Sequence, residues 1–284
     1  MSDILQVKNL TYKYATGTPF EKTAVDNISF TVRQGEFVSI IGHTGSGKST
    51  LVQMLNGLIK PTSGKVFFNQ NDIWKEPKKI RNIRFKVGMV FQYPEYQLFE
   101  ETVAKDIAFG AKNMGLTESE IQNRVESSVE FVGLEKSFLK KSPFELSGGE
   151  KRRVAIAGVI AMNPEILILD EPTAGLDPMG RELLLSQIRQ YHEKQKNTIL
   201  FVSHSMEDVA RISDRVLVMN SGHTEYFDTP ENVFAQGEHL KNMGLKIPQI
   251  TQIMNTLSDK GYHVGKGVLT IEKAVEELLT ILKK

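Results

Sequence analysis

The chain opens with two segments in which apolar and polar residues alternate, at residues 4–7 and 28–32. Alternation with this period is typical of a β-strand that buries one face and exposes the other. Strands buried on one face only are usually found in antiparallel sheets. The N-terminal part of the chain therefore predicts an antiparallel β subdomain.

The pattern then changes to short apolar runs separated by helical or polar sequence. Residues 37–41 form such a run before Gly42, and residues 48–58 carry apolar side chains at helical spacing. Similar runs recur at residues 87–91, 166–169, 199–202 and 216–219. Short apolar runs fit strands covered on both faces, and their alternation with helices predicts a mainly parallel sheet. The expected fold class is therefore α/β.

Two further regions complete the predicted architecture. Residues 118–132 and 147–162 have helical spacing and stand between two predicted strands, which indicates an inserted helical subdomain at about 95–162. The alternation stops after about residue 225, and a stretch punctuated by Gly and Pro leads to an amphipathic helix at 271–282. We expect a domain at 1–225 and a C-terminal extension at 226–284. The apolar face of its last helix could pack on its own chain or on another subunit.

The composition limits the binding partners and the cellular compartment that we expect for this chain. The 284 residues include 35 basic and 34 acidic side chains, so no overall field attracts nucleic acid or anionic lipid. There is no cysteine, which fits a reducing compartment. We see no secretory signal and no apolar stretch near the roughly 20 residues that a membrane span needs. We expect a cytoplasmic protein, and any transport would use another protein's pore.

The strongest chemical signal is a glycine-rich loop between a predicted strand and a predicted helix. The loop and the residue after it are Gly42, His43, Thr44, Gly45, Ser46, Gly47, Lys48, Ser49 and Thr50. This spacing matches the phosphate-binding loop, in which backbone amides and a helix N-terminus hold a polyphosphate. Lys48 would bridge the outer phosphates, and Ser49 would ligate magnesium. His43 is interpreted as a spacer, because no further metal ligands accompany it.

Two adjacent carboxylates follow the apolar run at residues 166–169. Successive side chains at a strand end point in different directions, so Asp170 and Glu171 can have different roles. We expect Asp170 to hold magnesium through water and Glu171 to polarise the water that attacks the γ-phosphate. The alternative is an acidic pair that caps a following helix, and Pro172 weakens that alternative.

A second anion cradle is predicted at Ser147, Gly148, Gly149 and Glu150. Ser147 and Glu150 have the spacing of a capping box, and the two glycines leave the helix amides bare. Since the chain has only one phosphate loop, we predict a dimer in which each cradle closes over the other subunit's nucleotide. An ordinary capped helix without a ligand is the alternative, and it is the simpler explanation of this segment alone.

Together these segments resemble the ABC superfamily of ATPases over about residues 4–225. The phosphate loop corresponds to Walker A, Asp170 ends Walker B, residues 146–150 match the signature, and residues 174–177 match the D-loop. The resemblance implies ATP and Mg²⁺ as cofactors and ATP hydrolysis as the activity. It implies a fold of the ABC type of P-loop NTPase.

The resemblance also assigns roles to single residues. It implies that Gln92 senses magnesium and the γ-phosphate, that His204 contacts the γ-phosphate as a switch histidine beside the catalytic Glu171 and Lys48, and that Tyr14 stacks on adenine. Tyr12 competes with Tyr14 for the adenine. Asp177 is expected to cap a helix that begins at Pro178, and the resemblance adds a contact across the dimer.

The signature departs from the family at Glu150, where Gln is usual. Both residues can complete a capping box, but Glu brings a negative charge towards the partner's nucleotide. We expect Lys151, Arg152 and Arg153 to offset this charge.

Shorter segments, residues 42–45, 92–99, 155–162 and 171–174, are similar to the ATPases of energy-coupling factor (ECF) transporters, and within that group to the second of two ATPase types. This resemblance implies a pair of ATPases, the second a paralogue, docked on a transmembrane coupling subunit at the cytoplasmic face of the membrane. A separate substrate-binding membrane subunit would choose the vitamin or metal ion. The C-terminal extension would help to hold the ATPases together.

The aromatic and apolar residues at 93–99 are expected in an exposed loop, where they would form a docking groove for the membrane partner. Packing into the helical subdomain is the alternative.

Two other functions compete with transport. An ABC ATPase acting on nucleic acid would use the basic stretch at 75–86, which a solvated charged face explains more simply. A nucleotide-dependent switch without turnover is disfavoured by Glu171.

Overall fold

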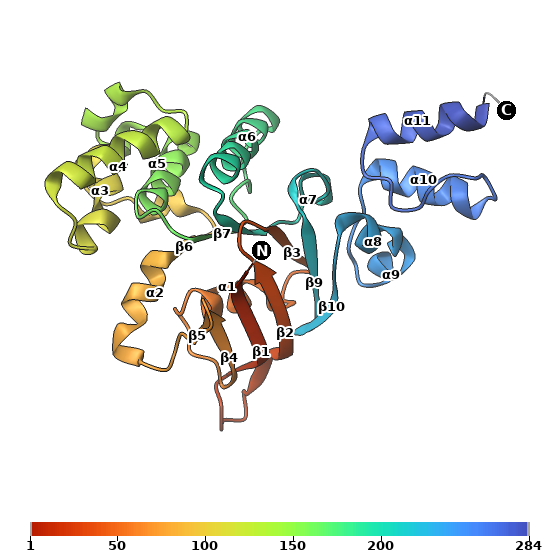
Figure 1. Cartoon of the computed structure of the whole chain (residues 1–284), viewed down its shortest axis with the longest axis horizontal. Coiled ribbons are helices and arrows are strands. Elements are labelled where there is room, and N and C mark those ends of the chain that lie inside the picture. Colours follow the sequence, from red (N-terminus) through yellow and green to blue (C-terminus); the bar gives the residue numbers. More distant parts are fainter. Residues whose placement is uncertain (1, 283–284) are drawn as a thin grey trace.

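The computed structural model describes residues 2–282, and Figure 1 shows two sheets surrounded by helices. The smaller sheet has the strand order β2-β1-β4-β5 and is antiparallel throughout. Its strands are β1 (Asp3–Tyr14), β2 (Lys22–Arg33), β4 (Ser63–Phe68) and β5 (Asn71–Asp72). The predicted antiparallel subdomain is confirmed, and β4 and β5 are additions that the sequence pattern did not indicate.

The larger sheet has the strand order β10-β9-β3-β8-β7-β6. Its strands are β3 (Phe37–Gly42), β6 (Val87–Val90), β7 (Ile166–Asp170), β8 (Thr198–Val202), β9 (Arg215–Asn220) and β10 (His223–Asp228). All pairings are parallel except that of β10 with β9. The predicted α/β fold with a mainly parallel sheet is therefore confirmed. β10 escaped prediction because its half-exposed, polar sequence forms no apolar run.

Strand β7 shows why the central strands are apolar on both faces. Ile166 and Ile168 point into a core shared with the antiparallel sheet and with α1 (Lys48–Leu55). Leu167 and Leu169 point to the other face, into a core shared with the helical subdomain. Two packed layers thus fix the sheet from both sides, and the ends of its strands are held in place.

The helical subdomain consists mainly of α3 (Val103–Asn113), α4 (Glu118–Phe131) and α5 (Gly148–Ile160), which are inserted between β6 and β7. Helix α2 (Ile80–Lys86) precedes β6. Each of the three begins at a side-chain cap, provided by Thr102, Thr117 and Ser147. The helices predicted at 118–132 and 147–162 are present within two residues of their expected ends. Helix α3 was not anticipated.

The chain then forms α6 (Pro178–Gln195), α7 (Met206–Ile212), α8 (Pro230–Ala235), α9 (Gly237–Asn242), α10 (Gln249–Asp259) and α11 (Ile271–Leu282). Val233 and Phe234 of α8 share a core with the sheet, whereas α10 and α11 build a small core of their own. Figure 1 shows α10 and α11 on the opposite side of the molecule from the helical subdomain. The division after residue 225 stays a prediction. Within residues 2–282, no helix combines the length and apolarity needed to cross a bilayer.

Some apolar residues of helix α11 are packed against the chain, and others are exposed to solvent. Ala274, Leu278 and Ile281 pack against α10 and its neighbours. Ile271 and Leu279 are 65% and 47% exposed. Packing on its own chain therefore accounts for only part of the amphipathic pattern, and an apolar stripe remains on the surface.

Arg152 of α5 fastens the helical subdomain to the edge of the sheet. Its side chain is 5% exposed, and Nε and Nη2 donate to Glu95 at 3.0 and 2.7 Å. Nη1 also donates to the carbonyl oxygens of Pro172 and Ala174. Burial raises the pKa of Glu95, but the hydrogen bonds and charge of Arg152 bring it below its ordinary 4.5. The pair therefore stabilises the fold above about pH 4.5 and loses this contribution as the pH falls through the lowered pKa.

We predict that Arg152→Met lowers the free energy of unfolding by roughly 3 kcal/mol, because Glu95 keeps its burial and loses its counter-charge. Urea unfolding followed by circular dichroism measures the change. Arg189→Met is the control, since Arg189 pairs with Glu193 at a site where both side chains are about 60% exposed. The control should lose less than about 0.5 kcal/mol. Equal losses in the two variants would contradict the prediction.

Candidate functional site

Four loops meet at one edge of the larger sheet. The loops after β3, β6, β7 and β8 carry the glycine-rich segment, Gln92, Glu171 and His204, in that order. Because these four strands are parallel, their carboxyl ends lie at the same edge, which is where ligands of open α/β sheets bind. The sheet therefore brings together residues that are far apart in the sequence.

The glycine-rich loop turns tightly from β3 into α1. Gly45 and Gly47 have φ angles of +83° and +101°, which side chains with a Cβ rarely adopt. A Cβ on Gly47 would lie 2.2 Å from the carbonyl oxygen of Ala24, and a Cβ on Gly42 would lie 2.4 Å from that of Met219. The loop thus fits against β2 and β9 only with glycine at these positions. The tight turn that the sequence predicts between strand and helix is therefore present.

Lys48 lies beneath this loop with 5% of its surface exposed. Its Nζ donates to the carbonyl oxygens of Gly42 and His43 at 2.8 and 3.1 Å. Burial lowers the pKa of Lys48, and the nearby charges of Glu171 and Asp170 oppose that shift. A cation held in this way can interact with phosphate oxygens above the loop.

Asp170 is the buried member of the carboxylate pair. Burial raises its pKa, while a hydrogen bond from Ser49 and the charge of Lys48 act in the opposite direction. One carboxylate oxygen, Oδ1, is buried without a hydrogen-bond partner among residues 2–282. A lone carboxylate oxygen beside a hydroxyl fits a magnesium ion or its bound water, since Mg²⁺ prefers oxygen ligands and keeps several waters.

Glu171 is the centre of a three-residue cluster. Its φ of +50° places it in the left-handed region, and its carbonyl oxygen accepts from the amide of Ala174 at 3.1 Å. The Nε2 of Gln92 donates to Oε2 at 2.9 Å, and the Nε2 of His204 lies 2.8 Å from Oε1. The structure therefore brings together the three residues that the sequence predicted separately.

A pocket of about 560 Å³ joins the loop to this cluster. It is lined by Tyr14, Lys22, Ala24, Thr44, Gly45, Gly47, Lys48, Ser49, Thr50, Gln92, Glu171 and His204. Tyr14 reaches it from β1 and pairs its hydroxyl with that of Thr50 at 3.0 Å. Tyr12 instead packs against the core and meets Tyr14 edge to face. Gly42, His43 and Ser46 belong to the loop without lining the pocket.

Two further residues line this pocket that the sequence patterns do not indicate, Lys22 and Ala24 of β2. No motif marks them, because their position depends on how the antiparallel sheet packs beside the loop. This packing is seen at Gly47, where a Cβ would lie 2.2 Å from the carbonyl oxygen of Ala24.

The signature segment lies on the helical subdomain and does not line the pocket. The predicted capping box is present: Ser147 accepts from the amide of Glu150, and Glu150 accepts from the amide of Ser147 at 2.8 Å. Apart from their chain neighbours and the backbone of α5 itself, no described atom lies within 4 Å of a Cβ built on Gly148 or Gly149. The side of α5 on which a side chain of these two residues would lie is therefore open.

The charge of Glu150 is offset differently from our expectation. Hydrogen bonds from Ser147 lower its pKa, and the charges of Arg153 and Lys141 add to this effect. Of the three cations that we expected to offset it, Arg153 contributes, whereas Lys151 and Arg152 do not. The guanidinium of Arg152 is instead paired with Glu95.

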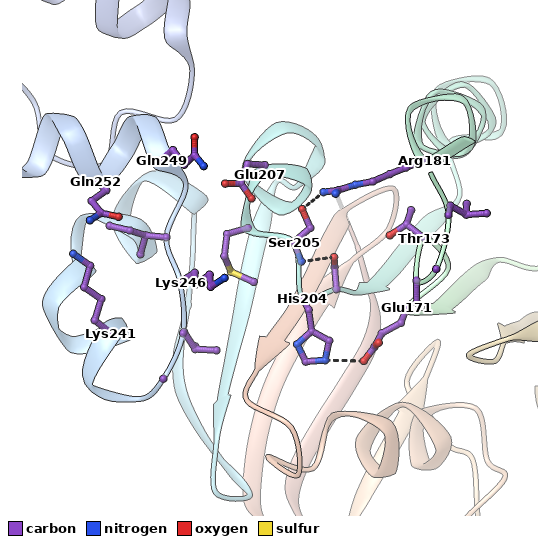
Figure 2. A pocket seen from close by; sticks show the side chains of 18 residues that line it. Glu171, Thr173, Arg181, His204, Ser205, Glu207, Lys241, Lys246, Gln249 and Gln252 are labelled. Carbon is purple, nitrogen blue, oxygen red and sulfur yellow. Dashed lines mark hydrogen bonds and ion pairs between the residues drawn. The ribbon is translucent and has the colours of Figure 1, made fainter. Parts of the chain in front are cut away.

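The D-loop region borders a second pocket, of about 850 Å³, on the other side of Glu171 and His204 (Figure 2). Thr173 to Leu176 form one wall, and Lys241, Lys246, Gln249 and Gln252, on α9, α10 and the loop between them, form the opposite wall. Asp177 caps α6 as predicted, with Oδ1 accepting from the amide of Gly180 at 2.6 Å. The Glu171–His204 pair thus separates two pockets.

The apolar segment after Gln92 divides between core and surface. Pro94 is buried and Leu98 packs against the helical subdomain. Tyr96 and Phe99 are 85% and 59% exposed, and Phe99 meets the half-exposed Phe109 edge to face at 5.0 Å. An exposed aromatic surface therefore lies on the side of the helical subdomain, as the docking hypothesis requires.

Comparison with known proteins agrees with this geometry. The profile of the ABC transporter family matches residues 25–174. The energy-coupling factor transporter ATP-binding protein EcfA2 of Clostridium acetobutylicum is 53% identical over 280 residues, which are 98% of each chain. The protein of the same name from Clostridioides difficile is 54% identical and covers 98% of this chain and 97% of its own.

Solved structures show the same relationship. The structure of cbiO1 from Clostridium perfringens, described as part of the ABC transporter complex cbiONQ, has a TM-score of 0.76 and 39% identity, with 89% of this chain and 99% of that chain covered. The ATP-binding cassette MJ0796, solved as a dimer in a post-hydrolysis state with ADP and phosphate, has a TM-score of 0.72 and 29% identity, with 80% and 98% covered. The chain belongs to the ABC transporter family and, within it, to the energy-coupling factor transporter ATP-binding proteins.

Proposed function

We propose that the pocket beside the glycine-rich loop binds Mg²⁺-ATP and that Glu171 activates the attacking water. The observation that carries this proposal is the position of the Glu171 carboxylate, which borders the pocket and is held by Gln92 and His204 from the two neighbouring strands. A general base must be oriented within hydrogen-bond reach of the water that it activates. Phosphoryl transfer otherwise needs positioning and charge stabilisation, which the loop amides and Lys48 provide.

The nucleotide would be held by the loop amides and Lys48, with Tyr14 against the adenine. Magnesium would be held by Ser49 and by Asp170 through water, with Gln92 nearby. When bound, magnesium neutralises phosphate charge during the transfer. The buried free oxygen of Asp170 and the adjacent hydroxyl support this assignment.

The active unit in this proposal is a dimer of ATPases. Gly148 and Gly149 begin α5 outside the pocket of their own chain, and no side chain covers them, so this helix N-terminus can serve a nucleotide on another subunit. The related cassette MJ0796 was solved as a dimer, which supports the proposal. Closure on ATP requires that the nucleotide bind the closed dimer more tightly than the open one. Asp177 and the D-loop would lie at the contact between the subunits.

The partners follow from the ECF relatives. We assign this chain to a complex with a second, paralogous ATPase, a transmembrane coupling subunit and a membrane subunit that binds a vitamin or other micronutrient. The exposed aromatic residues around Tyr96 and Phe99 would receive the coupling subunit, at the cytoplasmic face of the membrane. The C-terminal extension from residue 226 would contact the second ATPase through the exposed stripe of α11. An importer of cobalt, nickel or another solute is the second candidate, supported by the likeness to a part of the cbiONQ complex.

We predict that Glu171→Gln slows ATP turnover by at least about 100-fold while ATP still binds, because the base is lost and the phosphate cradle is kept. Phosphate release by the complete transporter and binding of a fluorescent ATP analogue measure the two properties. Glu182→Gln is the control, since it makes the same change at an exposed helix position outside the pocket. Unchanged turnover in Glu171→Gln would show that another group acts as the base.

We predict that Glu150→Gln leaves turnover within a few-fold of the unaltered chain. Gln can still accept from the amide of Ser147, and one partly exposed charge is worth only about 1 kcal/mol. Steady-state ATPase rates of the two complexes test this. A collapse of turnover would mean that the negative charge of Glu150 has its own role at the dimer contact.

The assignment of partners predicts that mild-detergent extracts of membranes yield this chain together with a second ATPase and two kinds of membrane protein. Mass spectrometry of the purified complex identifies them. A chain recovered without membrane proteins, together with a salt-dependent mobility shift of DNA or RNA, would favour a nucleic-acid ATPase instead.

A further inference from the structure

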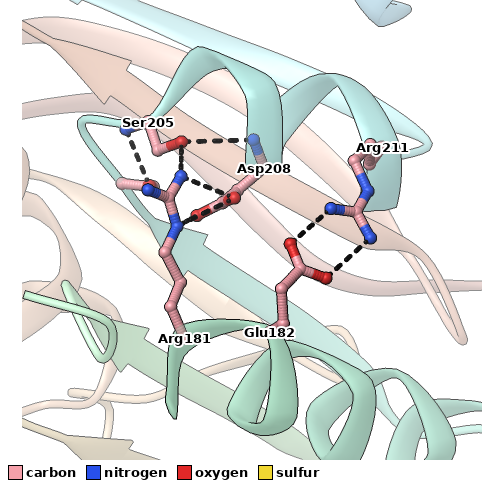
Figure 3. A network of polar contacts seen from close by, with 6 residues as sticks. Arg181, Glu182, Ser205, Asp208 and Arg211 are labelled. Carbon is pink, nitrogen blue, oxygen red and sulfur yellow. Dashed lines mark hydrogen bonds and ion pairs between the residues drawn. The ribbon is translucent and has the colours of Figure 1, made fainter. Parts of the chain in front are cut away.

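Arg181 lies in the first turn of α6 and reaches across to α7 (Figure 3). Its Nε donates to Oδ2 of Asp208 at 2.9 Å, and its Nη2 donates to Oδ1 at 2.7 Å. The same Nη2 donates to the hydroxyl of Ser205. One guanidinium therefore joins the helix after the D-loop to the residue that follows His204.

The contact with Asp208 fixes the guanidinium in place. The side chain of Asp208 is 2% exposed, so its carboxylate depends on a paired cation. Two hydrogen bonds to one carboxylate also fix the plane of the guanidinium, which a single hydrogen bond would not do. Asp208 thus orients Arg181, whose Nη2 donates both to Asp208 and to the hydroxyl of Ser205 (Figure 3).

Ser205 is the residue at which the His204 loop is anchored. Its hydroxyl accepts from Arg181 and from the amide of Asp208, and its own amide donates to the hydroxyl of Ser203 at 3.0 Å. His204 itself is 46% exposed and contacts Glu171 through Nε2. The direction of the imidazole therefore depends on a turn that is held mainly through Ser205.

Arg181 is also tied to the D-loop. Its amide donates to the carbonyl oxygen of Asp177 at 2.9 Å, within the turn that Asp177 caps. A displacement of Asp177 would therefore carry the backbone of Arg181 with it. Arg181, His204 and the D-loop residues Ala174 to Leu176 also line the same pocket (Figure 2).

A second ion pair joins the same two helices without touching the His204 loop. Glu182 and Arg211 form two hydrogen bonds, at 2.6 and 3.1 Å, and both side chains are more than half exposed. Packing of α6 on α7 is therefore supported by a neighbouring contact of the same chemistry (Figure 3). This pair provides a matched comparison for Arg181.

We propose that Arg181 is a positioning residue that holds His204 towards Glu171 and the γ-phosphate through Ser205, and that it transmits movement of the D-loop to His204. The inference rests on the proposed role of His204. Arg181 touches no substrate in this scheme, and its effect passes through the Ser205 hydroxyl.

The test compares Arg181→Gln with Arg211→Gln in the complete transporter. Because misplacement of a catalytic group by about 1 Å can cost up to about 100-fold, we expect Arg181→Gln to lower kcat by about tenfold. Its KM for ATP should change by less than about threefold, since the loop and Lys48 remain intact. Arg211→Gln should keep kcat within about twofold, because exposed ion pairs contribute little. Thermal unfolding of both variants checks that the fold is kept.

A second variant separates the Ser205 contact from the charge. Ser205→Ala should lower kcat with little change in KM, and the double variant Arg181→Gln/Ser205→Ala should lose less than the product of the two single losses. Should Arg181→Gln fail to fold, Ser205→Ala carries the test alone. Unchanged kcat in Ser205→Ala, multiplicative losses in the double variant, or equal effects of the two arginine variants would overturn the inference. A low turnover in Glu171→Gln alongside any of these results would leave the proposed function standing.

Discussion

The site depends on one geometric constraint, the parallel alignment of β6, β7 and β8. Parallel alignment puts the residues that follow these strands side by side, and the carboxylate of Glu171 can then accept from Gln92 while it meets His204. The strands are held in this arrangement by cores on both faces, so the cluster inherits the rigidity of the sheet. The glycine-rich loop is fixed against the same sheet, because glycine alone fits between its neighbours. In the proposed function, groups on a scaffold of this kind would need little reorganisation when a nucleotide binds.

Much of this could be predicted from the sequence, because the decisive signals are local. The loop spacing, the paired carboxylates after an apolar run and the capping box each need only a few consecutive residues. The structure finds Lys48, Asp170 and the Ser147 cap in the settings that these patterns indicate. The mainly parallel character of the larger sheet could be inferred as well, since buried parallel strands have continuous apolar sequences. The order of its strands, in contrast, is known only from the structure.

The parts that escaped prediction depend on contacts between distant segments. Lys22 and Ala24 enter the pocket only because the antiparallel sheet packs beside the loop, and β10 is a polar edge strand. The partner of Arg152 could not be read from its neighbours, since Glu95 is 57 residues away along the chain. The expectation that Arg152 would offset Glu150 was wrong for this reason. Arg152 is close to Glu150 in the sequence, but its charge is neutralised by Glu95 instead.

The left-handed backbone at Glu171 has a consequence for how the sequence can change. A residue with a Cβ is held there against a conformational preference of roughly 1 kcal/mol, which glycine would not feel. Mutational drift that favoured stability alone would therefore tend to replace this carboxylate, and under the proposed role of Glu171 the more stable protein would no longer turn over ATP. Stability and the proposed activity therefore favour different residues at this position, and the sequence has the residue that is less favourable for stability.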